Sequence, residues 1–151
     1  MKIPPARSAL CDQTHKLASR VAYGARACLD GAMICHITTR AAWEGAQASG
    51  QFFSPEFDQH GFIHCSTPEQ VLLVANAFFR GRTDLILLTI DPARLKSLVR
   101  WEPAHSTGRL PDFTLDAVFP HVYGPINVDA VVRTVNLDPT DTGSFILPRP
   151  A

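Results

Sequence analysis

The chain has 151 residues, of which 46% are hydrophobic, and its fourteen basic and fourteen acidic side chains give a formal net charge of zero. This length and composition suit one globular domain with one core, and the charge balance excludes bulk nucleic acid and anionic membranes as expected partners. No apolar run approaches the roughly 18 residues that span a bilayer, so we expect a soluble protein.

The first 32 residues differ from the rest, because five Lys or Arg accompany only two Asp and the helical patterning is weak. They lack the continuous apolar stretch of a secretory signal. We interpret residues 1–32 as an extension, residues 33–137 as the domain, and residues 138–151, rich in Pro, Asp, Thr and Gly, as a tail.

The four cysteines, at positions 11, 28, 35 and 65, include no C-x-x-C pair and form no disulfide framework. Cys35 and Cys65 lie in apolar runs, where a small buried thiol is the ordinary interpretation. We therefore expect a reducing, cytoplasmic compartment.

The domain begins with a predicted strand over residues 34–38 and a helix through residues 41–48, with Thr39 as its cap and Ser49-Gly50 as its end. Residues 51–61 then predict a loop. Its three phenylalanines suit the cover of a pocket better than idle exposure to solvent.

A second strand is predicted over residues 62–65. The run Thr67-Pro68-Glu69-Gln70 follows, with a capping threonine, a proline at the first helical position and a glutamine that reaches back. This pattern predicts the start of a helix. The apolar stripe of that helix runs to Phe79, and Arg80-Gly81 ends it.

The remaining elements are mostly strands. The continuous apolar run 85–90 predicts a central strand buried on both faces. A capped turn over residues 91–95 and short strands over residues 99–102, 118–122 and 128–135 follow. Several short strands with two principal helices indicate an α+β fold.

Three histidines, His36, His64 and His121, each lie in a strand-like run beside small polar residues. A single histidine of this kind is usually a hydrogen-bonded structural residue. Three of them in one small domain predict a shared cleft, in which an imidazole can act as acid or base near neutral pH.

These segments also carry a family resemblance. His36-Ile37-Thr38-Thr39, the run from Gly61 to Gln70, Ile90-Asp91-Pro92, Arg100-Trp101-Glu102 and the run from Phe119 to Pro125 resemble the Domain of Unknown Function 952 family of small bacterial proteins. The resemblance covers about residues 33–137. It implies a fold similar to that of ADP-ribosyltransferases, a split and strongly bent antiparallel sheet flanked by helices, whose cleft in those enzymes receives NAD.

The same resemblance implies roles for several residues. His36 and Thr38 are similar to the His-x-Thr that holds the nicotinamide-side ribose and amide, and the run from His64 to Thr67 falls on the second site strand. Ser66 and Thr67 would then contact the ligand. The third position is usually a glutamate, but His121 stands there in this sequence, followed by Tyr123 as a further cleft residue.

The missing glutamate bears on the chemistry, because cleavage of the nicotinamide bond builds positive charge that a carboxylate stabilises. Glu102 supplies that charge if its strand returns to the cleft. The competing interpretation is a solvated ion pair between Arg100 and Glu102. A phosphate-handling cleft, similar to the RNA 2′-phosphotransferase branch, would use Arg80 and Arg82 as anion contacts, although basic residues commonly end helices.

We therefore expect a cleft that binds NAD, a nucleotide or another phosphorylated small molecule, with NAD as a substrate and no metal. Transferase chemistry in this cleft is one hypothesis. A non-catalytic binding module is the second, with an aromatic pocket formed by Trp43, Phe53, Phe57, Trp101 and Tyr123. The third is a hydrolase whose metal is held by the three histidines, although these lack short spacings such as H-x-H. The sequence leaves the oligomeric state open.

Overall fold

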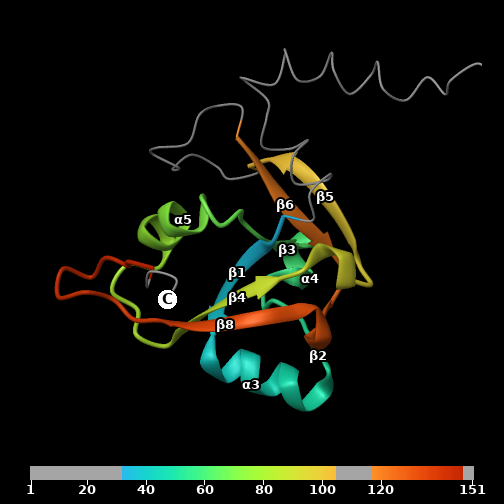
Figure 1. Ribbon diagram of the computed structural model, residues 1–151, viewed down its shortest axis with the longest axis horizontal. Coiled ribbons are helices and arrows are strands. Elements are labelled where there is room, and N and C mark those ends of the chain that lie inside the picture. The colour runs from blue at the N-terminus through green and yellow to red at the C-terminus, as the bar shows by residue number, and fades with distance from the viewer. Residues whose placement is uncertain (1–31, 105–116, 148–151) are drawn as a thin grey trace, which may run out of the picture.

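The computed structural model describes residues 32–104 and 117–147, so the predicted extension lies almost wholly outside the described residues. Within them the fold is α+β, as predicted, with antiparallel strands and flanking helices in a single domain (Figure 1). No helix in these two ranges is long and apolar enough to cross a membrane.

The first sheet has β4 (Leu85–Ile90) between β1 (Ile34–Thr39) and β8 (Val131–Leu137). The apolar run was predicted to form a central strand, and the structure confirms this, since five of the six β4 residues are buried. The last strand begins at Val131 instead of at 128, because residues 128–130 form the short 3-10 helix η2 (Val128–Ala130).

The second sheet has β6 (Val118–Tyr123) between β3 (Ile63–His64) and β5 (Leu98–Pro103). A small pair, β2 (Gln51–Phe52) with β7 (Ile126–Asn127), lies apart from both sheets. The predicted loop over residues 51–61 thus contains β2 and a short helix, α4 (Phe57–His60).

The two larger sheets meet at one antiparallel bridge between Cys35 and Ser66. The Cys35 amide donates to the Ser66 carbonyl at 2.7 Å, and the Ser66 amide donates to the Cys35 carbonyl at 2.8 Å. Beyond this bridge the chain of β3 pairs with β6, not with β1. One edge of β1 therefore faces the space between the two sheets.

The helices begin at the caps that the sequence predicts. For α3 (Arg40–Ser49), the Thr39 hydroxyl accepts a hydrogen bond from the Ala42 amide, and Gly50 ends the helix in the left-handed region. Asp91 caps the 3-10 helix η1 (Pro92–Arg94) in the same way, through the amide of Ala93.

The predicted capping box precedes α5 (Val71–Phe78). The Gln70 amide donates to the Thr67 hydroxyl at 3.2 Å, and the Thr67 amide donates to Gln70 Oε1 at 3.0 Å. The regular helix starts three residues later than predicted, because residues 68–70 form turns.

Two apolar clusters form the core. One packs α3 against the first sheet, extends to Ile63 and Val122 of the second, and includes Trp43, which is 6% exposed, with Trp101 and Phe57 packed on it. These three rings of the predicted aromatic pocket therefore fill core space, whereas Phe53 is 51% exposed. The other cluster, between α5 and the first sheet, includes Phe145 of the tail. The Phe145 amide donates to Asn76 Oδ1 at 2.7 Å, so this part of the tail packs on the domain.

Candidate functional site

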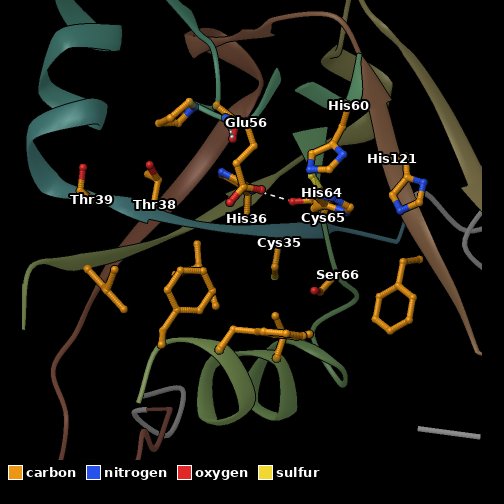
Figure 2. Close-up of a pocket in the computed structure, with 18 of the residues that line it drawn as sticks. Cys35, His36, Thr38, Thr39, Glu56, His60, His64, Cys65, Ser66 and His121 are labelled. Atoms are coloured by element: carbon orange, nitrogen blue, oxygen red, sulfur yellow. Dashed lines mark hydrogen bonds between the residues drawn. The ribbon is translucent and has the colours of Figure 1, made fainter. Parts of the chain in front are cut away.

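A cavity of about 650 Å³ opens along the edge of β1 where the two sheets diverge (Figure 2). Its walls come from β1, the segment through β3 and Ser66, β6, the end of α5, and residues 54–60. The structure brings the three predicted histidines to this one cavity, together with two of the predicted hydroxyl residues. These are His36, Thr38, His64, Ser66 and His121.

The His36 imidazole lies on the wall formed by β1 and is only 8% exposed. Its Nδ1–H donates to the His64 carbonyl oxygen at 2.6 Å. This side-chain hydrogen bond is a second link between the sheets, next to the backbone bridge of Cys35 with Ser66. Burial lowers the pKa of His36 from 6.5 to about 4. At neutral pH this ring is uncharged, with Nε2 as its acceptor.

The His121 imidazole lies on the opposite wall, on β6, and is 1% exposed. Its Nδ1 lies 2.8 Å from Oε2 of Glu102, and the Tyr123 hydroxyl donates to the same oxygen at 2.7 Å. Pairing of β5 with β6 sets Arg100 opposite His121 and Glu102 opposite Phe119, so Glu102 reaches back to the histidine. The carboxylate raises the pKa of Tyr123 above its usual value of 10.

The sequence also suggested an ion pair between Arg100 and Glu102. In the structure, Glu102 instead has the two partners just described, and the Arg100 guanidinium lies 5.0 Å from the centre of the Tyr123 ring. Both side chains project from the same face of β5, but Arg100 contacts the ring of Tyr123, whereas Glu102 binds His121 and the Tyr123 hydroxyl.

A row of rings connects the rim of the cavity with His121. Phe62 stacks on His121 at 4.3 Å between ring centres, and the His64 ring lies edge-on to His121 at 5.3 Å. The His60 ring follows at 5.2 Å from His64. The row therefore runs from an exposed histidine at the rim to a buried histidine in the wall.

Four predicted site residues lie outside the cavity lining. Tyr123 and Glu102 stand behind His121, and the Thr67 hydroxyl caps α5. Arg80 donates to the Thr142 carbonyl at 3.2 Å, whereas Arg82 lies among the lining residues. Of the two arginines proposed as anion contacts, Arg82 therefore lies at the cavity and Arg80 does not.

Both buried thiols, Cys35 and Cys65, line the cavity but do not suit a nucleophilic role. Burial raises the pKa of Cys35 to about 11 and raises that of Cys65 as well. Because the thiolate is the reactive form, neither sulfur attacks a substrate readily at neutral pH. The groups left for chemistry at the cavity are therefore its imidazoles, its hydroxyls and the Glu102 carboxylate that contacts His121.

Sequence reasoning missed two residues of the cavity rim, Glu56 and His60. They precede His64 at intervals of four residues, and the ligand-type atoms of the three side chains all lie within 4.8 Å of one another. The sequence signal is the spacing E-x3-H-x3-H, which lies in the segment whose phenylalanines predict an aromatic loop. This group has the residue types that bind a transition metal.

Comparisons with known proteins agree with the motifs. The family described as "Protein of unknown function (DUF952)" matches residues 37–134. A crystal structure of protein CC0527 from Caulobacter crescentus is 34% identical, with a TM-score of 0.64, covering 76% of this chain and 93% of that one. A solution structure of CC0527 is 35% identical, with a TM-score of 0.58, covering 74% and 90%. No curated protein matches.

Proposed function

The chain belongs to the DUF952 family, whose description names no reaction, and we propose from its own cavity that it binds a nucleotide or another phosphorylated small molecule. NAD is among these ligands, and in such a complex His121 acts as a general acid or base. One observation carries the proposal, namely the convergence of His36, His64 and His121 on one cavity.

The size and lining of the cavity support a small-molecule ligand. Pockets of roughly 300–1,000 Å³ with apolar walls and a few convergent polar groups are typical binding sites. Here the apolar part comes from Val74, Phe78, Phe79 and Leu85, and the polar part from the histidines and hydroxyls. Cys35 and Ile37 face α5, whereas His36 and Thr38 lie on the other face of β1, so a ligand that contacts both parts would pass around the open edge of this strand (Figure 2).

The β1 wall provides neutral hydrogen-bonding groups. His36 is uncharged at neutral pH, and its Nδ1 is occupied by the His64 carbonyl, so Nε2 is available as an acceptor for a hydroxyl or amide. Thr38 lies two residues along the same strand and is also buried. This pair suits the positioning of a ribose or an amide and not the neutralisation of charge.

The opposite wall provides the acid–base group. A carboxylate that accepts from Nδ1–H orients the imidazole, makes Nε2 the basic nitrogen and stabilises the imidazolium that forms when a proton is taken. Glu102 stands in this position toward His121. His121 stands where the resemblance led us to expect a glutamate. Glu102, which lies behind His121, supplies a negative charge close to that position.

Arg82 supports a phosphorylated ligand, since a guanidinium at the cavity matches phosphate geometry. The same guanidinium donates through Nε and Nη2 to the two carboxylate oxygens of Asp84, at 3.3 and 3.0 Å, so this ion pair orients it and a phosphate is expected to bind through Nη1. The buried thiols support the further proposal of a reducing, cytoplasmic location.

Thermal unfolding with a panel of NAD, ADP-ribose and phosphorylated nucleosides tests the proposal. A ligand present at a hundredfold excess over its dissociation constant should add about 2.7 kcal/mol to the free energy of unfolding. His36→Ala and His121→Ala should abolish the shift, each measured against its own unliganded melting temperature. If either variant fails to fold, Thr38→Val and Ser66→Ala replace it.

A matched pair of arginine variants sharpens this test. Arg82→Ala should weaken the shift for phosphorylated ligands, while Arg80→Ala, whose side chain holds the Thr142 carbonyl, should leave it unchanged. A shift by unphosphorylated apolar compounds alone favours the non-catalytic binding module. No shift with any nucleotide contradicts the proposal.

A further inference from the structure

We propose that Glu56, His60 and His64 form a binding site for a divalent transition metal of the zinc type at the rim of the cavity. The three side chains are all exposed, and one ligand-type atom from each lies within 4.8 Å of the others. The site shares His64 with the nucleotide proposal but does not include His36 or His121, whose variants test that proposal.

The local fold explains why these residues meet. Glu56 is the N-cap residue of α4 and His60 is its last residue, so one helical turn brings both to the same side. Gly61, at a φ of 73°, then reverses the chain into β3, which returns His64 beneath His60. Phe57 packs against the core cluster and holds this turn in place.

The spacing needs only a small closure to bind a metal. Zinc holds nitrogen ligands at about 2.0–2.1 Å, which places tetrahedral ligand atoms about 3.3 Å apart. Exposed side chains can supply the remaining approach by rotating about their own bonds. The His60 and His64 rings already lie 5.2 Å apart at an angle of 71°, so their nitrogens can converge without stacking (Figure 2).

The donor set selects the class of metal. Two imidazoles with one carboxylate suit zinc and similar transition metals, whereas calcium and magnesium prefer oxygen ligands throughout. Three protein ligands leave one position of a tetrahedral zinc open to water or a ligand. All three residues line the cavity, so that open position belongs to the same space.

His64 connects this rim with the wall of the cavity. Its backbone carbonyl holds His36 at 2.6 Å, and its ring lies 5.3 Å from the ring of His121. A metal bound to the His64 ring would therefore lie next to the row of rings that leads from His60 to the buried His121.

Titration of the chelator-stripped full chain with Zn²⁺, followed by calorimetry, tests the site, with Co²⁺ as a spectroscopic substitute that reports four-coordination. We expect one metal ion per chain. Glu56→Gln and His60→Ala should each weaken binding by at least about tenfold, because loss of even a supporting hydrogen bond costs known sites roughly 10–100-fold. His64→Ala should do the same.

Asp58→Asn is the matched control, since Asp58 is an exposed carboxylate of the same short helix outside the group. It should leave the affinity unchanged. Absence of stoichiometric binding, or binding that survives both Glu56→Gln and His60→Ala, overturns the inference. The nucleotide shift of the stripped protein is measured separately, so failure of one proposal is distinguishable from failure of the other.

Discussion

The two three-stranded sheets differ in what their strands carry. The first sheet has the apolar β4 at its centre, buried on both faces between the two core clusters. The second has β6 at its centre, where one face presents His121 among the rings of Phe62, His64 and Tyr123. The comparison indicates that both sheets bury apolar residues in the core, Ile63 and Val122 of the second sheet included, and that the second sheet in addition supplies polar groups to the cavity.

The largest effect is expected in the first sheet. Leu88 is fully buried at the centre of β4, so Leu88→Ala leaves a cavity in the core and should lower the free energy of unfolding by about 2–5 kcal/mol. Chemical denaturation measures this loss. A loss below about 1 kcal/mol would contradict the placement of Leu88 in a tightly packed core.

The next effect depends on pH and concerns His36, the polar residue that the first sheet contributes. The unfolded chain binds a proton at this side chain below about pH 6.5, but the folded protein does so only below about pH 4. Stability is therefore complete above pH 6.5 and falls as the pH decreases to 4, by up to about 3 kcal/mol at 1.36 kcal/mol per pKa unit.

His36→Gln isolates this contribution, because glutamine does not titrate. Denaturation of both proteins across pH 4–7 should give a steeper decrease for the unsubstituted chain. Equal slopes would mean that His36 is not protonated differently in the two states.

A smaller effect is expected for the polar pair of the second sheet. Glu102→Gln keeps the shape but removes the charge from its hydrogen bonds to His121 and Tyr123, which should cost about 1–2 kcal/mol. The pKa of Tyr123 should also decrease toward 10, since the carboxylate is the main cause of its increase. Ultraviolet titration of the two tyrosines measures this change, and an unaltered profile argues against the observed pairing.

The smallest effect separates a cap from a ligand contact. Thr67→Ala removes the hydroxyl that accepts from the Gln70 amide and should cost about 1 kcal/mol, as for other helix caps. It should leave any nucleotide-induced shift in melting temperature intact. Loss of that shift at unchanged stability would instead return Thr67 to the binding site.

Local patterns in the sequence predicted much of the fold. Thr39, Asp91 and the Thr67–Gln70 box all cap as expected, because a cap depends on residues within one turn of each other. The central position of β4 was also predictable, since a strand buried on both faces has a continuous apolar run. The convergence of three histidines followed from their similar strand settings.

The partners of those histidines were not predictable in the same way. Contact of Glu102 with His121 depends on the register of β5 with β6, and a single sequence does not specify that register. The position of Trp43 in the core was not predictable either, because a tryptophan fits a core as well as a pocket. His60 was missed because its spacing was judged within a loop, whereas the chain forms a helical turn there.

The backbone bridge between Cys35 and Ser66 offers a way to measure how often the cavity opens. Two backbone amides hold the sheets together at this point, and the walls that carry His36 and His121 extend from either side of it. A motion that separates the two sheets at this point must break these two hydrogen bonds. Hydrogen exchange at these two amides therefore reports how often the cleft opens, and a bound ligand that spans both walls would slow it.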